Sequence, residues 1–229
     1  MARRKPTPPP PPRYEDWLEF HFARLPEQAT TDFLFEDDGD CWQSEPVETL
    51  LLIAEMLRRS GTDLLQFTDA QVGVGLDGIF NASMSDDGHT IIGSAAEPEL
   101  HTAVFLGFWQ LYRDCLAQRA PDALGHLDEA RGPLANFCYM FWDTSAIGHW
   151  QATPGKSSQV DALFRAFEAG LSTGHHGCME SALHGIGHLH SSMEERGRET
   201  VERFRQSKRN RIRPELVRYA EAAAQQLVQ

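Results

Sequence analysis

The segment His175–His190 holds five of the ten histidines and has the pattern of an amphipathic helix. Turned at 100° per residue, its apolar side chains fall within an arc of about 140°, and its polar side chains fall on the other side. The apolar side consists of Cys178, Met179, Ala182, Leu183, Ile186, Leu189 and Met193. Gly185 and Gly187 each destabilise a helix interior by roughly 1 kcal/mol, but they let a neighbouring helix come close. We therefore predict a helix packed near the centre of an all-helical domain.

Glu180, His184 and His188 are spaced four residues apart and form a stripe along the polar side of this helix. Two histidines at i and i+4 can bind one metal ion, as in helical zinc sites. Glu180 is a candidate ligand or base, but it lies about 12 Å from His188 along the axis, so further ligands must come from elsewhere. We expect these further candidates in connections between helices: His126, Asp128, Asp143 and His149. The alternative, which we prefer, is a pair of polar histidines on a solvated or partner-facing surface.

Most of the remaining chain also has helical periodicity, and several segments carry signals for the start or end of a helix. Four prolines stand at the start of a predicted helix, where their fixed φ fits: Pro46, Pro98, Pro133 and Pro214. The helix that begins at Pro98 is predicted to run to about Arg119. Thr68 and Gln71 match a capping box, and Gly61 is placed to end the helix that begins at Pro46. Only Thr90–Ile92 suggests a short extended piece. We predict an all-α fold, a compact multi-helix domain, with one shared core that includes Trp109, Phe137, Phe141, Trp142, Leu183 and Ile186.

The segment Gly73–Gly78 formally matches the dinucleotide-binding pattern GxGxxG. That fingerprint requires a strand before it and a βαβ unit around it. Here the capping box precedes the glycines, and no β-rich run lies upstream. We interpret the segment as part of a helix that runs to about Met84, and we expect no bound nucleotide.

The chain begins with a proline-rich segment that contains Pro6 and Pro8–Pro12. Such a sequence forms an extended polyproline helix and contributes no core. We expect residues 1–12 to be a disordered tail and residues 13–229 to form a single α-helical domain. Glu27–Gln43 lacks helical periodicity and is interpreted as a loop.

Composition and charge exclude several classes of protein. The net charge of −12 argues against a general nucleic-acid binder, because phosphate contacts need a basic surface. No apolar run approaches the roughly eighteen residues that span a membrane, so we expect no membrane association through a spanning helix. The four cysteines are dispersed and include no CxxC pair, which indicates a reduced, cytoplasmic protein: Cys41, Cys115, Cys138 and Cys178.

The charge is distributed unevenly along the chain. Glu27–Glu48 contains eight acidic residues and no lysine or arginine, whereas Arg203–Arg213 contains six basic residues and no acidic one. Such runs are usually solvated surfaces. They are also able to attract each other within the fold or to attract charged partners.

The C-terminal third resembles a HEAT-type helical repeat. Ala182–Leu189 is similar to one repeat helix, Glu199–Arg205 to a second, and Arg213–Gln225 to the beginning of another. The resemblance implies HEAT-like helical hairpins over residues of about 158–229. Repeat helices of this kind usually serve as scaffolds that bind other proteins. Because stacked repeats normally number three or more, we expect a compact domain with HEAT-like hairpins at its C-terminal end.

The whole chain also resembles a family of uncharacterised bacterial proteins. The segments that carry this resemblance are His126–Glu129, Cys138–Asp143 and Glu180–Leu189. It implies no activity.

Three functions remain open from the sequence. We favour a non-enzymatic interaction or scaffold protein that binds a protein partner and carries no cofactor. The alternative is a metal-binding protein or metal-dependent hydrolase, with zinc bound through Glu180, His184 and His188. A third possibility, suggested by charge, is an acidic mimic or toxin-neutralising partner. The sequence leaves open whether the protein is an enzyme, which partner it binds and how it oligomerises.

Overall fold

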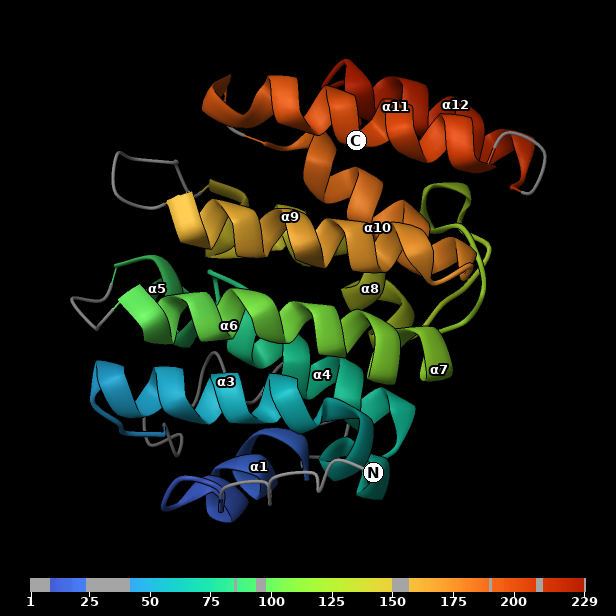
Figure 1. Cartoon of the computed structure of the whole chain (residues 1–229). Helices are drawn as coiled ribbons and strands as arrows, with labels where there is room; N and C mark the ends of the chain where they lie inside the picture. Colours follow the sequence, from blue (N-terminus) through green and yellow to red (C-terminus); the bar gives the residue numbers. More distant parts are fainter. Residues whose placement is uncertain are drawn as a thin grey trace, which may run out of the picture.

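The main helices lie in two stacked layers between which the chain alternates (Figure 1). One layer consists of helices that pack side by side in sequence order: α3 (Pro46–Asp63), α6 (Pro98–Gln110) and α9 (Ser157–Ser172). The second layer consists of helices that also pack in sequence order: α4 (Asp69–Phe80), α8 (Pro133–Thr144), α10 (His176–Gly187) and α12 (Pro214–Ala224). This computed structural model describes residues 9–23, 42–84, 86–93, 98–149, 157–189, 191–208 and 212–228.

Shorter or peripheral helices surround these layers. The α-helices among them are α1 (Tyr14–Phe22), α5 (Asp87–Gly93), α7 (Ala117–Arg119) and α11 (Glu194–Lys208). The 3-10 helices are η1 (Leu64–Gln66), η3 (Gly125–Leu127), η4 (Ala146–His149) and η5 (Ser191–Met193). A π-helical segment, η2 (Leu111–Leu116), joins α6 to α7, so the helix predicted from Pro98 to about Arg119 is continuous but changes its winding.

The all-α prediction is confirmed, since the described residues contain no strand and only an isolated β-bridge between Asn81 and Ser145. The alternation between layers begins at α3 and continues to α10, and it is compatible with a helical repeat. Among the described residues, no helix is both long and apolar enough to cross a membrane.

Local signals account for several helix boundaries. At the start of α4, the Thr68 hydroxyl accepts a hydrogen bond from the Gln71 amide at 3.3 Å, and the Gln71 side chain accepts one from the Thr68 amide at 3.0 Å. The predicted capping box is therefore present. The prediction that Gly61 ends α3 is wrong, because α3 continues to Asp63. A Cβ atom on Gly61 would lie 2.7 Å from Cβ of Asp114, so this glycine permits close packing instead.

Packing also explains the GxGxxG pattern, which lies within α4. A Cβ atom on Gly73 would lie 2.2 Å from the backbone nitrogen of Leu134, and one on Gly75 would lie 2.4 Å from the Phe22 ring. The glycines let α8 and α1 approach α4 closely. No strand precedes α4 in the described part of the chain.

Three other details differ from the sequence-based expectations. Thr90–Ile92 is part of α5, not extended. Asp143 lies in the last turn of α8, not in a connection, because α8 continues one residue beyond it. In the proline-rich segment, Pro10 lines a surface hollow beside α1 and α3. Residues 1–8 and 24–41 of the predicted tail and loop lie outside the described residues.

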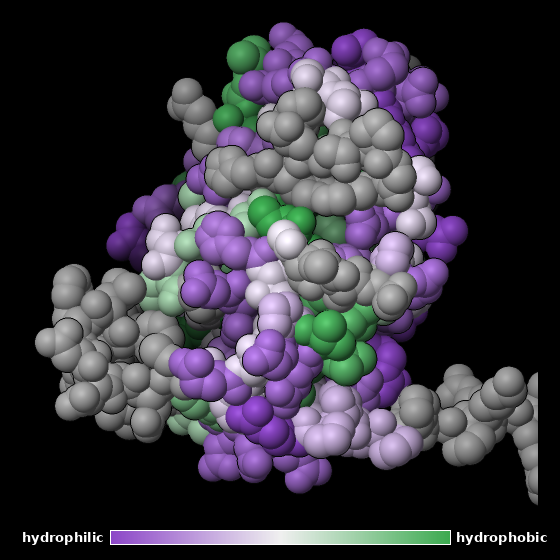
Figure 2. All heavy atoms as spheres, turned by 90° about the vertical axis from the view of Figure 1, so that its left-hand side faces the viewer, coloured by the Kyte–Doolittle hydropathy of each residue, from purple (hydrophilic) through white to green (hydrophobic). Residues whose placement is uncertain are grey.

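The buried side chains form one cluster that extends from Tyr14 to Val228. It contains all of the predicted core residues except Trp109, which is partly buried against the cluster. The guanidinium of Arg113 lies over that indole, with Cζ 3.8 Å from the ring centroid. On the face shown in Figure 2, hydrophobic residues form separate small patches among hydrophilic ones.

Arginines of the basic run Arg203–Arg213 form ion pairs within the protein. Three of its arginines form ion pairs with glutamates that lie outside the acidic run: Arg203–Glu168, Arg205–Glu221 and Arg213–Glu129. Of these, Arg203–Glu168 joins α11 to α9, and Arg213–Glu129 joins the start of α12 to the connection after η3. Most of the acidic run lies outside the described residues.

Replacement of Ile186 by alanine tests the position of α10 in the core. Ile186 is 2% exposed, so we expect Ile186→Ala to lower the free energy of unfolding by about 2–5 kcal/mol. Val47 is 50% exposed and serves as the control, since Val47→Ala should change that energy by less than about 0.5 kcal/mol. Denaturant titration measures both values, and equal small losses would contradict the packing of α10.

Candidate functional site

Helix α10 is buried on every side, including the side that carries its polar stripe. Residues 177–187 are all buried, because α8, α9, α11 and α12 surround the helix. Our preferred expectation placed the polar side on a solvated or partner-facing surface. The structure instead buries Glu180 and His184 within the protein, so these polar groups need partners there.

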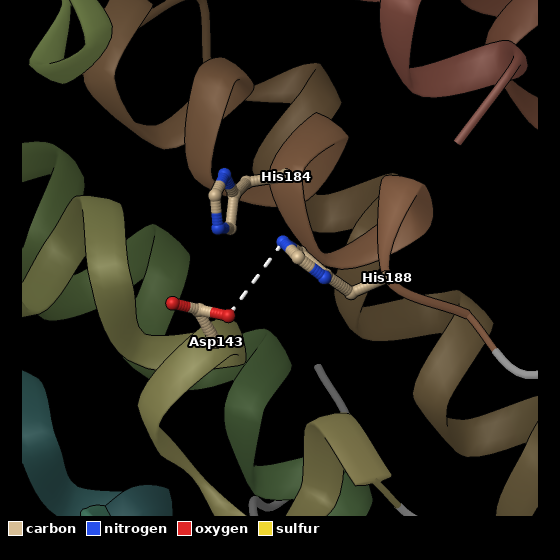
Figure 3. Close-up of side chains that lie close together, drawn as sticks. All are labelled: Asp143, His184 and His188. Atoms are coloured by element: carbon tan, nitrogen blue, oxygen red, sulfur yellow. Dashed lines mark ion pairs between the residues drawn. The ribbon is translucent and has the colours of Figure 1, made fainter. Parts of the chain in front are cut away.

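Asp143, His184 and His188 lie together where α8 and α10 meet, and their side chains point toward one another (Figure 3). Each offers a ligand atom, and these atoms all lie within 4.8 Å of one another. Nε2 of His188 is 3.8 Å from Oδ1 of Asp143, which is too long for a hydrogen bond. Of the candidates named from the sequence, the structure brings these three together.

His184 is the buried member of this cluster, with an exposed fraction of 1%. Its Nδ1 atom is 2.5 Å from the hydroxyl oxygen of Tyr219. Its Nε2 atom is buried and has no hydrogen-bond partner among the described residues. Burial, followed by the nearby charge of His188, lowers the pKa of His184 to about 4, although Asp143 opposes this shift. The imidazole is therefore neutral at pH 7, and one of its nitrogens carries a free lone pair.

The other two members reach the surface. The side chain of His188 is 31% exposed and that of Asp143 is 44% exposed. His188 follows directly after α10 as its C-cap residue, while Asp143 occupies the last turn of α8. The Nε2 atoms of His184 and His188 are nevertheless both buried and have no hydrogen-bond partner among the described residues, so the carboxylate of Asp143 is the more exposed side of the cluster.

Glu180 has a different environment and is not part of this cluster. Its carboxylate is fully buried and accepts hydrogen bonds from the Gly125 amide at 2.5 Å and the His126 amide at 3.1 Å. Nδ1 of His126 contacts the same carboxylate. Because these donors occupy both oxygens, Glu180 holds the connection containing η3 against α10, and it has no free oxygen for a metal.

The remaining predicted ligands do not join the cluster in the described part of the chain. His126 contacts Glu180, and its ring stacks on that of Tyr219 with centroids 4.7 Å apart. Asp128 is exposed and pairs with Arg131 at 2.6 Å. The side chain of His149 lies outside the described residues.

Sequence reasoning missed two tyrosines that surround His184. The hydroxyl of Tyr219 on α12 is bonded to the imidazole, and the Tyr139 ring centroid on α8 lies 4.9 Å from the His184 ring centroid. The two tyrosine hydroxyls are hydrogen-bonded to each other. Tyr219 stands among apolar residues of the helix that begins at Pro214. A hydroxyl among apolar residues was the available signal, because a buried hydroxyl needs a polar partner.

A surface pocket of about 340 Å³ has Tyr139, Glu180 and Cys138 among its lining residues, but Asp143, His184 and His188 do not line it.

The chain was compared with models of known families, with curated proteins and with solved structures, and none of them matches it. The chemistry of the site therefore rests on its own residues. Two imidazoles and a carboxylate form a donor set suited to a divalent transition metal.

Replacement of Glu180 by glutamine tests its structural role. The change keeps the shape of the side chain but turns one oxygen into an NH₂ group that faces donors. We expect the free energy of unfolding to fall by about 1–3 kcal/mol, because a buried donor loses its acceptor. Glu199 is exposed on α11, and Glu199→Gln should leave the energy within about 0.5 kcal/mol. Denaturant titration compares the two, and an unchanged Glu180→Gln protein would contradict this role.

Proposed function

We propose that this protein binds a divalent transition-metal ion through Asp143, His184 and His188. The observation that carries the proposal is the convergence of three ligand atoms within 4.8 Å around the buried, unpaired Nε2 atom of His184. A buried polar atom without a partner is destabilising by about 1–3 kcal/mol. An ion held by all three residues would satisfy it.

The distances are close to those that an ion requires. Zinc binds imidazole nitrogen at about 2.0–2.1 Å, so tetrahedral ligand atoms lie about 3.3 Å apart. The His188–Asp143 separation is 3.8 Å, and no pair exceeds 4.8 Å. The distances between the ligand atoms must therefore shorten by up to about 1.5 Å for an ion to bind. Rotation of the two partly exposed side chains provides this shortening, while the buried imidazole stays fixed.

The donor set narrows the identity of the ion. Two histidines and one carboxylate bind zinc in hydrolytic sites and iron(II) in non-haem sites, and both kinds of site keep coordination positions open. In this chain, the partly exposed carboxylate of Asp143 is the side from which water would reach those positions. A zinc ion would lower the pKa of a bound water, which is the basis of metal-dependent hydrolysis. We propose zinc or iron(II) as the ion.

Metal titration of the purified, metal-free protein tests this function. We expect the wild-type chain to bind zinc or iron(II) stoichiometrically and His184→Gln/His188→Gln to lose the ion, because both imidazole ligands are gone. Asp143→Asn should weaken binding. His176→Gln is the matched control, since this histidine lies at the other end of α10 and contacts Asp122. A wild-type chain that binds neither ion, measured by calorimetry and elemental analysis, would refute the proposal.

A second candidate function is a HEAT-like scaffold that binds a protein partner. The two-layer alternation of helices from α3 to α10 favours it, because stacked helical hairpins present extended surfaces. Both functions are compatible with a cytoplasmic protein, since the cysteines of the described part are free and buried. If the His184→Gln/His188→Gln variant loses the metal but stays folded, its binding to a protein partner tests the scaffold function separately.

A further inference from the structure

We propose that the Tyr219 hydroxyl fixes His184 in the tautomer that binds the ion, and that it thereby couples metal binding to the docking of α12. This inference rests on the proposed metal function. It assigns Tyr219 as a positioning residue, not as a ligand.

The geometry places Tyr219 at the junction of three groups. Its hydroxyl lies 2.5 Å from Nδ1 of His184 and is also bonded to the hydroxyl of Tyr139. Its ring stacks on that of His126 at 4.7 Å between centroids. Tyr219 is 7% exposed, so water does not readily replace these contacts.

The hydrogen-bond inventory decides between the two tautomers of His184. A neutral imidazole has one N–H donor and one acceptor nitrogen. If the proton were on Nε2, a buried donor would have no acceptor. If the proton is on Nδ1, it is donated to the Tyr219 hydroxyl, which in turn donates to Tyr139. The second arrangement gives an acceptor to the His184 proton and to the Tyr219 hydroxyl proton, and it leaves the lone pair of Nε2 directed toward His188 and Asp143.

Metal-binding histidines commonly donate their second nitrogen to such a partner, which orients the ring. Loss of the partner typically weakens metal affinity by about 10–100-fold. Removing the Tyr219 hydroxyl would leave Nδ1–H without an acceptor and remove the preference for the ligating tautomer. We therefore expect Tyr219→Phe to weaken metal binding by a factor in this range.

The same contact connects the ion to the C-terminal hairpin. Tyr219 is part of α12, whereas the ligands lie on α8 and at the C-terminal end of α10. If docking of α12 strengthens metal binding by some factor, metal binding must strengthen docking of α12 by the same factor. Bound metal should therefore slow amide hydrogen exchange in α12, and this slowing should be lost in Tyr219→Phe.

The experiment compares Tyr219→Phe with Tyr112→Phe. Tyr112 is also buried, and its hydroxyl is bonded to Ser181 of α10 at 2.8 Å, but it does not contact the cluster. Cobalt(II) and zinc(II) titrations give the affinities, the visible spectrum of bound cobalt(II) reports ligand geometry, and denaturant titration gives the stability of each metal-free variant. We expect a 10–100-fold loss of affinity and an altered cobalt spectrum for Tyr219→Phe only.

The outcomes separate this inference from the proposed function. If the wild-type chain binds neither metal, both are overturned. If it binds metal and Tyr219→Phe binds it equally well, the inference is overturned while the metal function stands. Equal losses of metal affinity in both tyrosine variants would mean that the loss comes only from a less stable fold. That result would also overturn the positioning role of Tyr219.

Discussion

The burial of a helix with polar residues on one side is the constraint on which the structure depends. Each polar group of α10 must find a partner from a neighbouring helix or connection. Glu180 takes backbone amides and His126 from the connection containing η3, Ser181 takes the Tyr112 hydroxyl, and His184 takes the Tyr219 hydroxyl. These contacts fix how the elements around α10 are placed. Nε2 of His184 and Nε2 of His188, the C-cap residue, are buried and have no hydrogen-bond partner among the described residues, and these two unpaired atoms make this packed region a candidate site.

Close approach is what allows α10 to be buried so completely. A Cβ atom on Gly185 would lie 2.6 Å from the Phe167 ring and 2.7 Å from the Trp142 ring, and one on Gly187 would lie 2.3 Å from Val228. Each glycine is destabilising in an isolated helix by roughly 1 kcal/mol. The side chains that pack against each glycine stabilise the protein by more than this, since a fully buried side chain of this size contributes about 1.5–3 kcal/mol.

The sequence predicted the features that depend on neighbouring residues and missed those that depend on distant ones. The helical class, the capping box of Thr68 and the close packing of Gly185 follow from local pattern, and the structure bears them out. Periodicity separates a polar from an apolar side, but it does not say whether the polar side meets water or protein. For that reason Glu180 was grouped with the histidines as a ligand. Asp143 was named as a candidate ligand without a geometric reason, because its position beside α10 depends on how α8 and α10 pack. Tyr219, 35 residues from His184, had no local signal that linked it to the site.

The division of the cluster into one buried and two exposed residues bears on how an ion would enter. In small zinc domains the metal supplies most of the folding energy, and the chain is unfolded without it. Here the buried cluster from Tyr14 to Val228 supplies a core of its own, and His184 is held by Tyr219 before any ion arrives. The proposed ion would therefore not be needed for folding. Asp143, whose side chain is 44% exposed, would provide the entry path, whereas the buried imidazole of His184 would determine where the ion stops. A site of this kind would take up its ion after folding, and its affinity would depend on how little the buried ligand has to move.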